Sequence, residues 1–141
     1  NLSFSFLLGK EIPSFIYAPQ NFFPFLAGFT DAEGSIFISK KGQAIYSLGN
    51  YNWALLCDIR QQLLARGIIC TSLIESKIKD RIEKDGYGHK QNYWHFTVGR
   101  KVSLALLLNK IVPFMKHSDK LEAAKKAREN ITVRDMLYGR L

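Results

Sequence analysis

Two carboxylate side chains stand close together near the end of a predicted helix. Asp31 and Glu33 are separated by one alanine, and Gly34 follows them. Carboxylate oxygens are ligands that a hard divalent cation such as Mg²⁺ prefers, and a helix C-terminus adds partial negative charge and free carbonyl groups. These residues could therefore form part of a metal site. The alternative is that both acids are solvated residues at the end of a helix.

Small residues occupy the same helix just before the acids. Gly28 and Ala32 are four residues apart and share one face, and Ala27 is the neighbour of Gly28. Such a face lets a second helix backbone approach closely. No other predicted helix of this chain carries a matching small face, so we expect the partner to be the same helix of a second copy, related by a two-fold axis. That packing would bring two copies of Glu33 together.

The elements that position these residues alternate between helices and hairpins. Apolar residues recur at helical or alternating spacing, and glycines separate the segments. The pattern predicts an α+β domain over residues 21–141, with one antiparallel four-stranded sheet covered by helices on one face. We expect residues 1–20 to be an irregular lead-in. The expected helices are 22–32, a segment within 50–67, 101–112 and 119–130, and the expected strands are 35–41, 43–49, 68–81 and 92–100.

The composition limits the class of protein. The chain has 141 residues, 47% of them hydrophobic, a formal charge of +8 and a sequence pI of about 9.6. These values favour one globular domain with a polyanionic partner, nucleic acid first and a membrane surface second. Cys57 and Cys70 lie outside any CxxC or Cys/His cluster, which argues against a zinc site. No apolar run is long enough to span a bilayer, and the first residues do not have the pattern of a signal peptide.

The segment LAGFTDAEG, residues 26–34, resembles the motif that names the LAGLIDADG homing endonucleases. Phe29, Thr30 and Glu33 are the variant positions, and Glu33 keeps the carboxylate. The predicted order of helices and hairpins agrees with the family's αββαββα core. The resemblance implies a sequence-specific double-stranded DNA endonuclease that uses Mg²⁺ or another divalent cation such as Mn²⁺. Because the chain has one motif, it also implies a homodimer whose two sheets form a saddle on the DNA.

The resemblance also implies roles for individual residues. Glu33 and the backbone carbonyl of Ala32 would bind the metal, and Asn50 would lie near the reacting water, although it could equally be a turn or cap residue. A basic residue near the start of the last long helix would support the site, and we favour Lys116 over His117 and Lys120. Serine, at position 118, stands where that basic residue would align. The expected dimer interface comprises Ala27, Gly28, Asp31 and Ala32, with Asp31 in a structural rather than catalytic role.

The strands on the uncovered face of the sheet would lie in the major groove of DNA. The side chains expected to meet bases or phosphates are Ser35, Phe37, Ser39, Lys40, Lys41, Gln43, Ser47, Lys77, Lys79, Arg81, Tyr93, His95 and Thr97. A non-cleaving binder, such as an intron RNA splicing helper (a maturase) on the same fold, is the main alternative. A structural dimer without nucleic acid does not explain the positive charge. We expect an intracellular, intron-encoded protein, and the sequence leaves open whether it acts in prokaryotic or archaeal cytoplasm or in an organelle.

Overall fold

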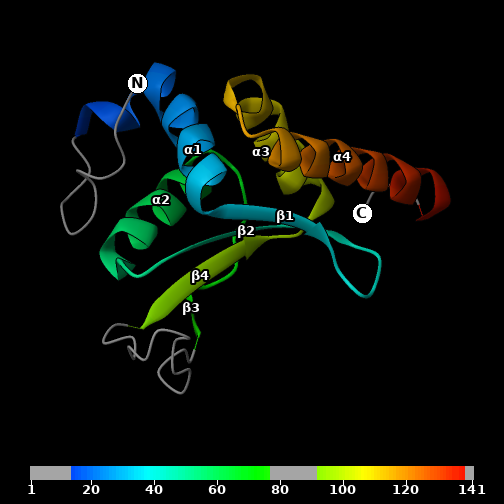
Figure 1. Cartoon of the computed structure of the whole chain (residues 1–141), viewed down its shortest axis with the longest axis horizontal. Coiled ribbons are helices and arrows are strands. Elements are labelled where there is room, and N and C mark those ends of the chain that lie inside the picture. Colours follow the sequence, from blue (N-terminus) through cyan, green and yellow to red (C-terminus); the bar gives the residue numbers. More distant parts are fainter. Residues whose placement is uncertain (1–13, 77–91, 139–141) are drawn as a thin grey trace.

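The structure is a computed structural model that describes residues 14–76 and 92–138. Within these ranges the chain forms four α-helices, four β-strands and two short 3₁₀-helices (Figure 1). In chain order the elements are η2 (Ser14–Tyr17), α1 (Pro19–Glu33), β1 (Gly34–Ile38), β2 (Ala44–Asn50), α2 (Trp53–Ala65), β3 (Ile74–Ser76), β4 (Tyr93–Val98), α3 (Lys101–Ile111), η3 (Val112–Phe114) and α4 (Ser118–Tyr138).

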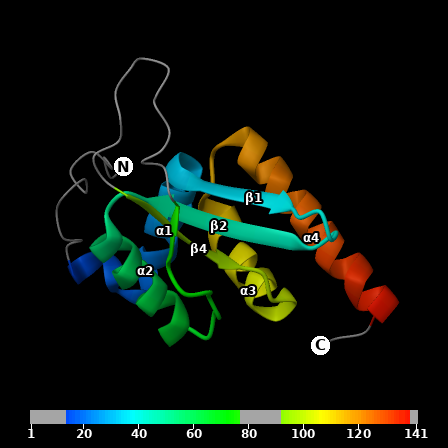
Figure 2. The ribbon, with the colours of Figure 1, turned by 90° about the horizontal axis from the view of Figure 1, so that it is seen from below.

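The strands form one antiparallel sheet in the order β1-β2-β4-β3. The helices lie on one face of this sheet (Figure 1), and a view from below shows β1, β2 and β4 side by side (Figure 2). Alternate residues of the strands explain this arrangement, because Ile36, Tyr46, Leu48, Phe96 and Val98 are buried against the helices. None of the described helices lies over the other face (Figure 1). The predicted α+β fold, with an open four-stranded sheet, is therefore confirmed.

Local signals in the sequence mark several element boundaries correctly. Asn52 caps α2, since its side-chain oxygen accepts a hydrogen bond of 3.1 Å from the Leu55 N–H. Gly34 ends α1 as predicted, and its N–H donates to the carbonyl of Thr30. Gly67 follows α2 with a positive φ of 82°, a conformation that glycine adopts readily.

Other boundaries differ from the prediction. Helix α1 begins at Pro19, so Pro24 lies inside the helix and not in its first turn. The predicted lead-in is also partly ordered, because η2 follows residue 13 and Ile16 is fully buried. Strand β3 covers only Ile74–Ser76 within the predicted 68–81, of which 77–81 lie outside the described residues. The last predicted helix, 119–130, is longer in the structure, where α4 extends from Ser118 to Tyr138.

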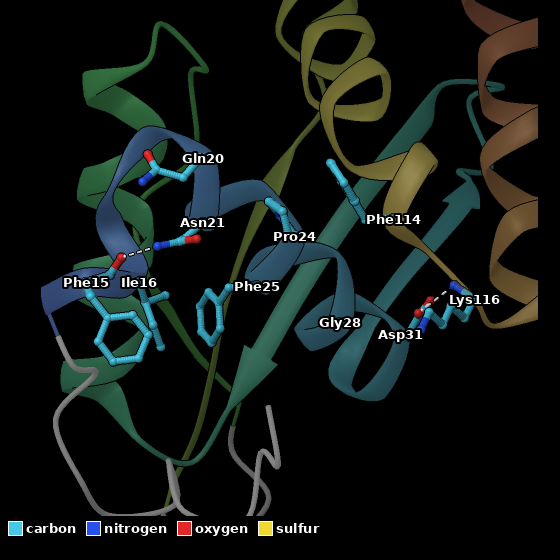
Figure 3. Close-up of a pocket in the computed structure, with 10 residues that line it drawn as sticks. All are labelled: Phe15, Ile16, Gln20, Asn21, Pro24, Phe25, Gly28, Asp31, Phe114 and Lys116. Carbon is cyan, nitrogen blue, oxygen red and sulfur yellow. Dashed lines mark hydrogen bonds between the residues drawn. The ribbon is translucent and has the colours of Figure 1, made fainter. Parts of the chain in front are cut away.

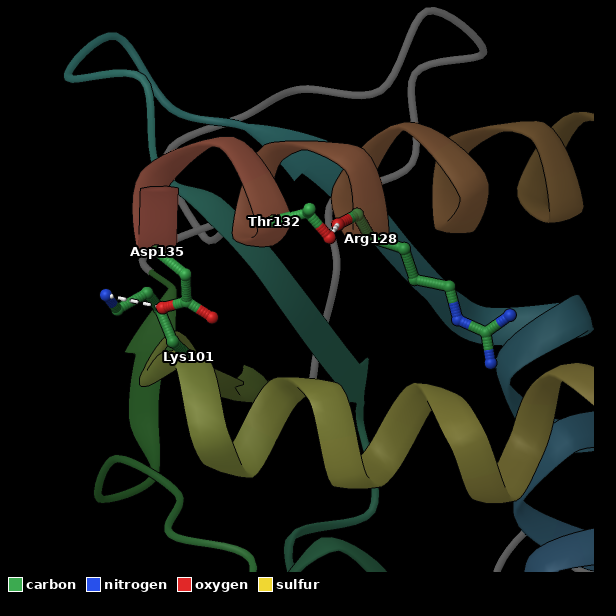
Figure 4. Close-up of polar contacts among 4 residues, drawn as sticks. All are labelled: Lys101, Arg128, Thr132 and Asp135. Carbon is green, nitrogen blue, oxygen red and sulfur yellow. Dashed lines mark hydrogen bonds and ion pairs between the residues drawn. The ribbon is translucent and has the colours of Figure 1, made fainter. Parts of the chain in front are cut away.

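Two sets of contacts fix α4 against α3. The Lys101 ammonium forms an ion pair of 2.9 Å with Asp135 (Figure 4). Two turns earlier in α4, the Arg128 guanidinium donates a hydrogen bond of 2.9 Å to the side-chain oxygen of Asn109. Buried Ala124, Ala127 and Ile131 lie on the inner side of α4. None of the described helices has the length and apolar character that crossing a membrane requires.

Candidate active site and nucleic-acid interface

The end of α1 presents the predicted metal ligands at the edge of the sheet. Glu33 is the last residue of α1, Gly34 is the first of β1, and both Ala32 and Glu33 are exposed. Gly34 pairs with Leu48, so the antiparallel register places Glu33 beside the last two residues of β2. The carboxylate of Glu33 is therefore at the point where α1 meets the uncovered face.

Asp31 joins α1 to the segment that precedes α4. Its carboxylate oxygens accept hydrogen bonds from the backbone N–H groups of Lys116, at 2.8 Å, and His117, at 3.3 Å. Both partners belong to the same chain. Asp31 thus connects α1 to the segment before α4 within one chain, in line with the structural role expected for it.

Lys120 is the lysine whose ammonium group reaches the end of α1. Its Nζ donates hydrogen bonds to the carbonyl oxygens of Thr30, at 3.0 Å, and Asp31, at 2.6 Å. A cation at this position offsets the negative end of the helix dipole. Lys116 has an exposed side chain and reaches α1 through its backbone, and Ser118 is the exposed first residue of α4. Lys120 was one of three basic candidates in the sequence. Which of the three contacts α1 depends on how distant segments pack, which the sequence does not show.

The end of β2 differs from the arrangement that the resemblance implied. Asn50 is only 5% exposed, and its side-chain oxygen accepts a hydrogen bond of 2.8 Å from the N–H of Asn52. It shares the helix-covered face with Tyr46 and Leu48. This position favours the turn role that the sequence left open for Asn50. The residue of β2 that belongs to the uncovered face here is Gly49.

A hollow of about 640 Å³ runs along the outer face of α1 (Figure 3). Gln20, Pro24, Gly28 and Asp31 contribute to its wall at helical spacing. Two exposed aromatic side chains flank it, Phe15 at 58% and Phe114 at 48% exposure. Gly28 and Ala32 thus face outward, as the dimer prediction requires.

Ala27 does not share that outward face. It is buried in the core of its own chain, together with Leu26 and Phe29. Its expected place at a dimer interface is therefore corrected, because adjacent helix positions differ by 100° in direction and only Gly28 of the pair turns outward.

The predicted nucleic-acid residues of the strands gather on the uncovered face. Ser35 pairs with Ser47, and Ser47 pairs in turn with Thr97, which gives a polar row across three strands. Ser35 and Phe37 are exposed, and Tyr93 and His95 continue this face along β4. The predicted contacts Lys77, Lys79 and Arg81 lie outside the described residues.

Some of these side chains already have partners within the protein. The Nδ1 of His95 lies 3.1 Å from the Ser76 hydroxyl, and the Thr97 hydroxyl donates to that of Thr71 at 3.3 Å. Gln43 donates from Nε2 to the carbonyl of Gly99 at 3.0 Å. Gln43 therefore bridges the sheet and is less available to DNA than its position in the sequence suggested.

The turn between β1 and β2 is held from behind by α4. The Asn130 side chain donates to the Gly42 carbonyl at 2.8 Å and accepts from the Ala44 N–H at 3.0 Å. Within the turn, the Ser39 hydroxyl accepts a hydrogen bond of 3.2 Å from the Gln43 N–H. Lys40 and Lys41 remain exposed at the tip. The turn therefore presents two cations on a fixed backbone, and the sequence alone gave no signal of the Asn130 contact.

The structure resembles that of the homing endonuclease I-CvuI in complex with its target in the presence of Ca, with 24% identity and a TM-score of 0.55 over 80% of this chain and 67% of that one. I-CvuI bound to the I-CreI target with Mg, described as revealing DNA not cleaved, gives 22% identity and a TM-score of 0.52 with the same coverage. At these identities the likeness shows the fold.

A search of curated protein sequences found no significant match. The profile of the LAGLIDADG endonucleases, by contrast, matches residues 26–131. This range includes the motif in α1, all four strands and most of α4. The chain therefore belongs to the LAGLIDADG endonuclease family.

Proposed function

We propose that this protein is a site-specific endonuclease that binds double-stranded DNA as a homodimer and hydrolyses phosphodiester bonds with the help of a divalent cation. The observation that carries the proposal is the place of Glu33, whose exposed carboxylate ends α1 at the edge of an uncovered, polar sheet face. A DNA-binding protein that did not cut would gain nothing from a carboxylate there, because the acid repels phosphate. Membership of the endonuclease family supports this interpretation.

The donor atoms at this site suit a hard cation such as Mg²⁺ or Mn²⁺. Glu33 offers carboxylate oxygens, and Ala32 offers a carbonyl at the negative end of a helix dipole. Within residues 14–76 and 92–138, no group of three His, Cys, Asp or Glu side chains could hold a metal by itself. A second copy of Glu33 and a DNA phosphate would complete the ligand set. The cation would supply stabilisation of the negative charge that develops during hydrolysis.

Lys120, in this proposal, supports the site in place of Lys116. Its ammonium binds the carbonyls of Thr30 and Asp31, which immediately precede the two proposed ligands. It thereby orients the last turn of α1 and holds positive charge near Glu33. Asp31 fixes the other side of the turn through the N–H groups of Lys116 and His117.

DNA binding would use the uncovered face and the β1–β2 turn. The net charge of +8 favours association with the phosphate backbone. Lys40 and Lys41 would contact phosphates, while polar side chains of β1, β2 and β4 would read base edges in the major groove.

Dimer formation would seat the α1 helix of one copy in the hollow along α1 of the other. Gly28 and Ala32 allow the backbones to approach, and the exposed rings of Phe15 and Phe114 offer apolar surface for burial. The two Glu33 carboxylates would then face opposite strands of one DNA duplex. Each protomer would cut one strand.

The proposal is tested by incubating the protein and its Glu33→Gln variant with a randomised DNA library and Mg²⁺, followed by sequencing of the cut ends. Once a target is found, gel-shift titration in Ca²⁺ and a cleavage time course on the same duplex separate binding from cutting. Glu33→Gln should bind with unchanged or tighter affinity and should not cut, because it keeps the size of the side chain but lacks the charge that holds the cation. Glu129→Gln, which changes an exposed acid on α4, should cut normally.

Two results would contradict the proposal. Undiminished cutting by Glu33→Gln would remove the carboxylate from the mechanism. A wild-type protein that binds RNA of an intron and leaves every DNA intact would instead identify a splicing helper, the alternative that the serine at position 118 first raised.

A further inference from the structure

The uncovered face of β2 ends in a gap that a tyrosine from β4 fills. Gly49 has no side chain, and a methyl group added to it would overlap the Tyr93 hydroxyl and approach the Tyr93 Cζ to 2.6 Å. The phenol ring therefore lies directly over the Gly49 backbone. The ring of Tyr51 contacts it edge-on, with centroids 5.0 Å apart and an interplanar angle of 78°. These two contacts fix where the Tyr93 hydroxyl points.

That hydroxyl is placed beside the proposed metal ligand. Gly34 pairs with Leu48, so continuing the antiparallel register by one residue places Glu33 next to Gly49, the residue under the Tyr93 ring. An ordinary phenol has a pKa of about 10, so the Tyr93 hydroxyl keeps its proton at neutral pH and can donate it to a hydrogen bond. Among the described residues, no side chain or carbonyl accepts a hydrogen bond from it.

We propose that Tyr93 is a catalytic residue whose hydroxyl donates a hydrogen bond to a non-bridging oxygen of the DNA phosphate that lies against Glu33. The inference deepens the proposed endonuclease function and rests on it. A phosphate that approaches a carboxylate is repelled and needs donors nearby. A neutral phenol provides one without adding a cation that would compete with the metal. Asn50, the polar residue expected at this end of β2, cannot do so because its side chain is on the other face and is bonded to Asn52.

The first test removes only the hydroxyl. Tyr93→Phe should lower the single-turnover cleavage rate by about a hundredfold, the lower end of the range typical of losing one donor to a developing oxyanion. Its affinity for the same duplex in Ca²⁺ should fall much less, by about twofold to fivefold, since many phosphate contacts contribute to binding. Tyr17→Phe is the matched control, because it removes a phenol hydroxyl that lies before the start of α1, at the opposite end of this helix from Glu33, and it should cut at the wild-type rate.

A second measurement needs no cleavage. Duplexes in which a methylphosphonate replaces one phosphate at a time across the cut region are titrated in Ca²⁺ with wild type and with Tyr93→Phe. If Tyr93 donates to a phosphate oxygen, one stereoisomer at one position should weaken wild-type binding more than it weakens binding by the variant. This non-additivity is a double-mutant cycle between the hydroxyl and the oxygen.

A third measurement tests the packing on which the inference depends. Gly49→Ala should lower the melting temperature and the cleavage rate in the wild-type background, because its methyl group displaces the phenol. In the Tyr93→Ala background the same change should have little effect on the melting temperature. Equal effects in both backgrounds would show that the ring does not lie on Gly49, and would overturn the inference.

The outcomes for the inference and for the proposed function are distinct. The role of Tyr93 would be refuted if Tyr93→Phe cut at the wild-type rate and if the effects of the variant and the methylphosphonates on binding were additive. The proposed endonuclease function would not be affected by that result. A wild-type protein that binds but does not cut would refute the endonuclease. In that case the methylphosphonate titrations would still decide whether Tyr93 contacts a phosphate, because they measure binding alone.

Discussion

Lys120→Met removes the cation that caps α1 while keeping most of the length and apolar volume of the side chain. In the wild type, Nζ donates to two carbonyl oxygens of α1, at 3.0 and 2.6 Å, from a half-buried position. A hydrogen bond to a charged group contributes roughly 1.5–3 kcal/mol when it is well formed, and a cation at a helix C-terminus adds about 0.3–1 kcal/mol. Because water can reach the free carbonyls in the variant, we expect a net loss of about 2 kcal/mol.

For a domain of this length, such a loss corresponds to a decrease of about 6–8 °C in melting temperature. The measurement is thermal unfolding followed by circular dichroism, with Lys125→Met as the matched control, since Lys125 is an exposed lysine of the same helix. Lys120→Arg keeps the charge and should lose less than half as much. A Lys120→Met protein that melts together with the Lys125→Met control would refute the reasoning, because the contact would then contribute nothing to the fold.

Three further outcomes are expected. Gly28→Leu fills the hollow on α1 and should convert the proposed dimer into a monomer in sedimentation; a wild-type monomer, alone and on DNA, would contradict the two-fold arrangement. Asn130→Leu removes both hydrogen bonds to the β1–β2 turn, so the Ala44 amide should exchange with solvent faster, and unchanged exchange would exclude the clamp. Burial raises the pKa of Cys70 to about 11 from 9.0, so the folded protein holds that proton more tightly, and the free energy of unfolding should fall as pH rises from 9 to 11. In urea titrations Cys70→Val should reduce this fall, and an equal fall in both proteins would rule out Cys70 as its source.

The parts of the fold that depend on neighbouring residues were predictable from the sequence. The stop at Gly34, the cap at Asn52 and the turn at Gly67 each use a side chain or a backbone conformation within a few residues of the element that they end. The alternation of strand residues also identified the uncovered face. It placed Ser35, Phe37, Tyr93 and Thr97 correctly, because a period of two is a property of the strand itself.

The details of the site depend on contacts between distant segments and could not be predicted in the same way. Asn50 and Gly49 are adjacent, and which of them faces the uncovered side depends on the pairing of β2 with both of its neighbours. The choice of Lys120 over Lys116 depends on the direction in which α4 leaves η3, and Asp31 sets that direction from another helix. Ala27 was assigned to the wrong side of α1 because small size is compatible both with a close helix pair and with a crowded core.

Helix α4 contacts the chain at both ends of strand β1. Lys120 binds the end of α1, just before β1 starts, and Asn130 binds the turn that follows β1. Ten residues of α-helix separate them, which amounts to about 15 Å at 1.5 Å per residue. B-form DNA advances about 3.4 Å per base pair, so this interval corresponds to roughly four base pairs. If the sheet lies along the groove as proposed, α4 holds the end of α1 and the β1–β2 turn at a constant distance. Substitutions on the uncovered face could then change which bases are read, while the distance between the cut and the phosphate contact of the turn stays the same.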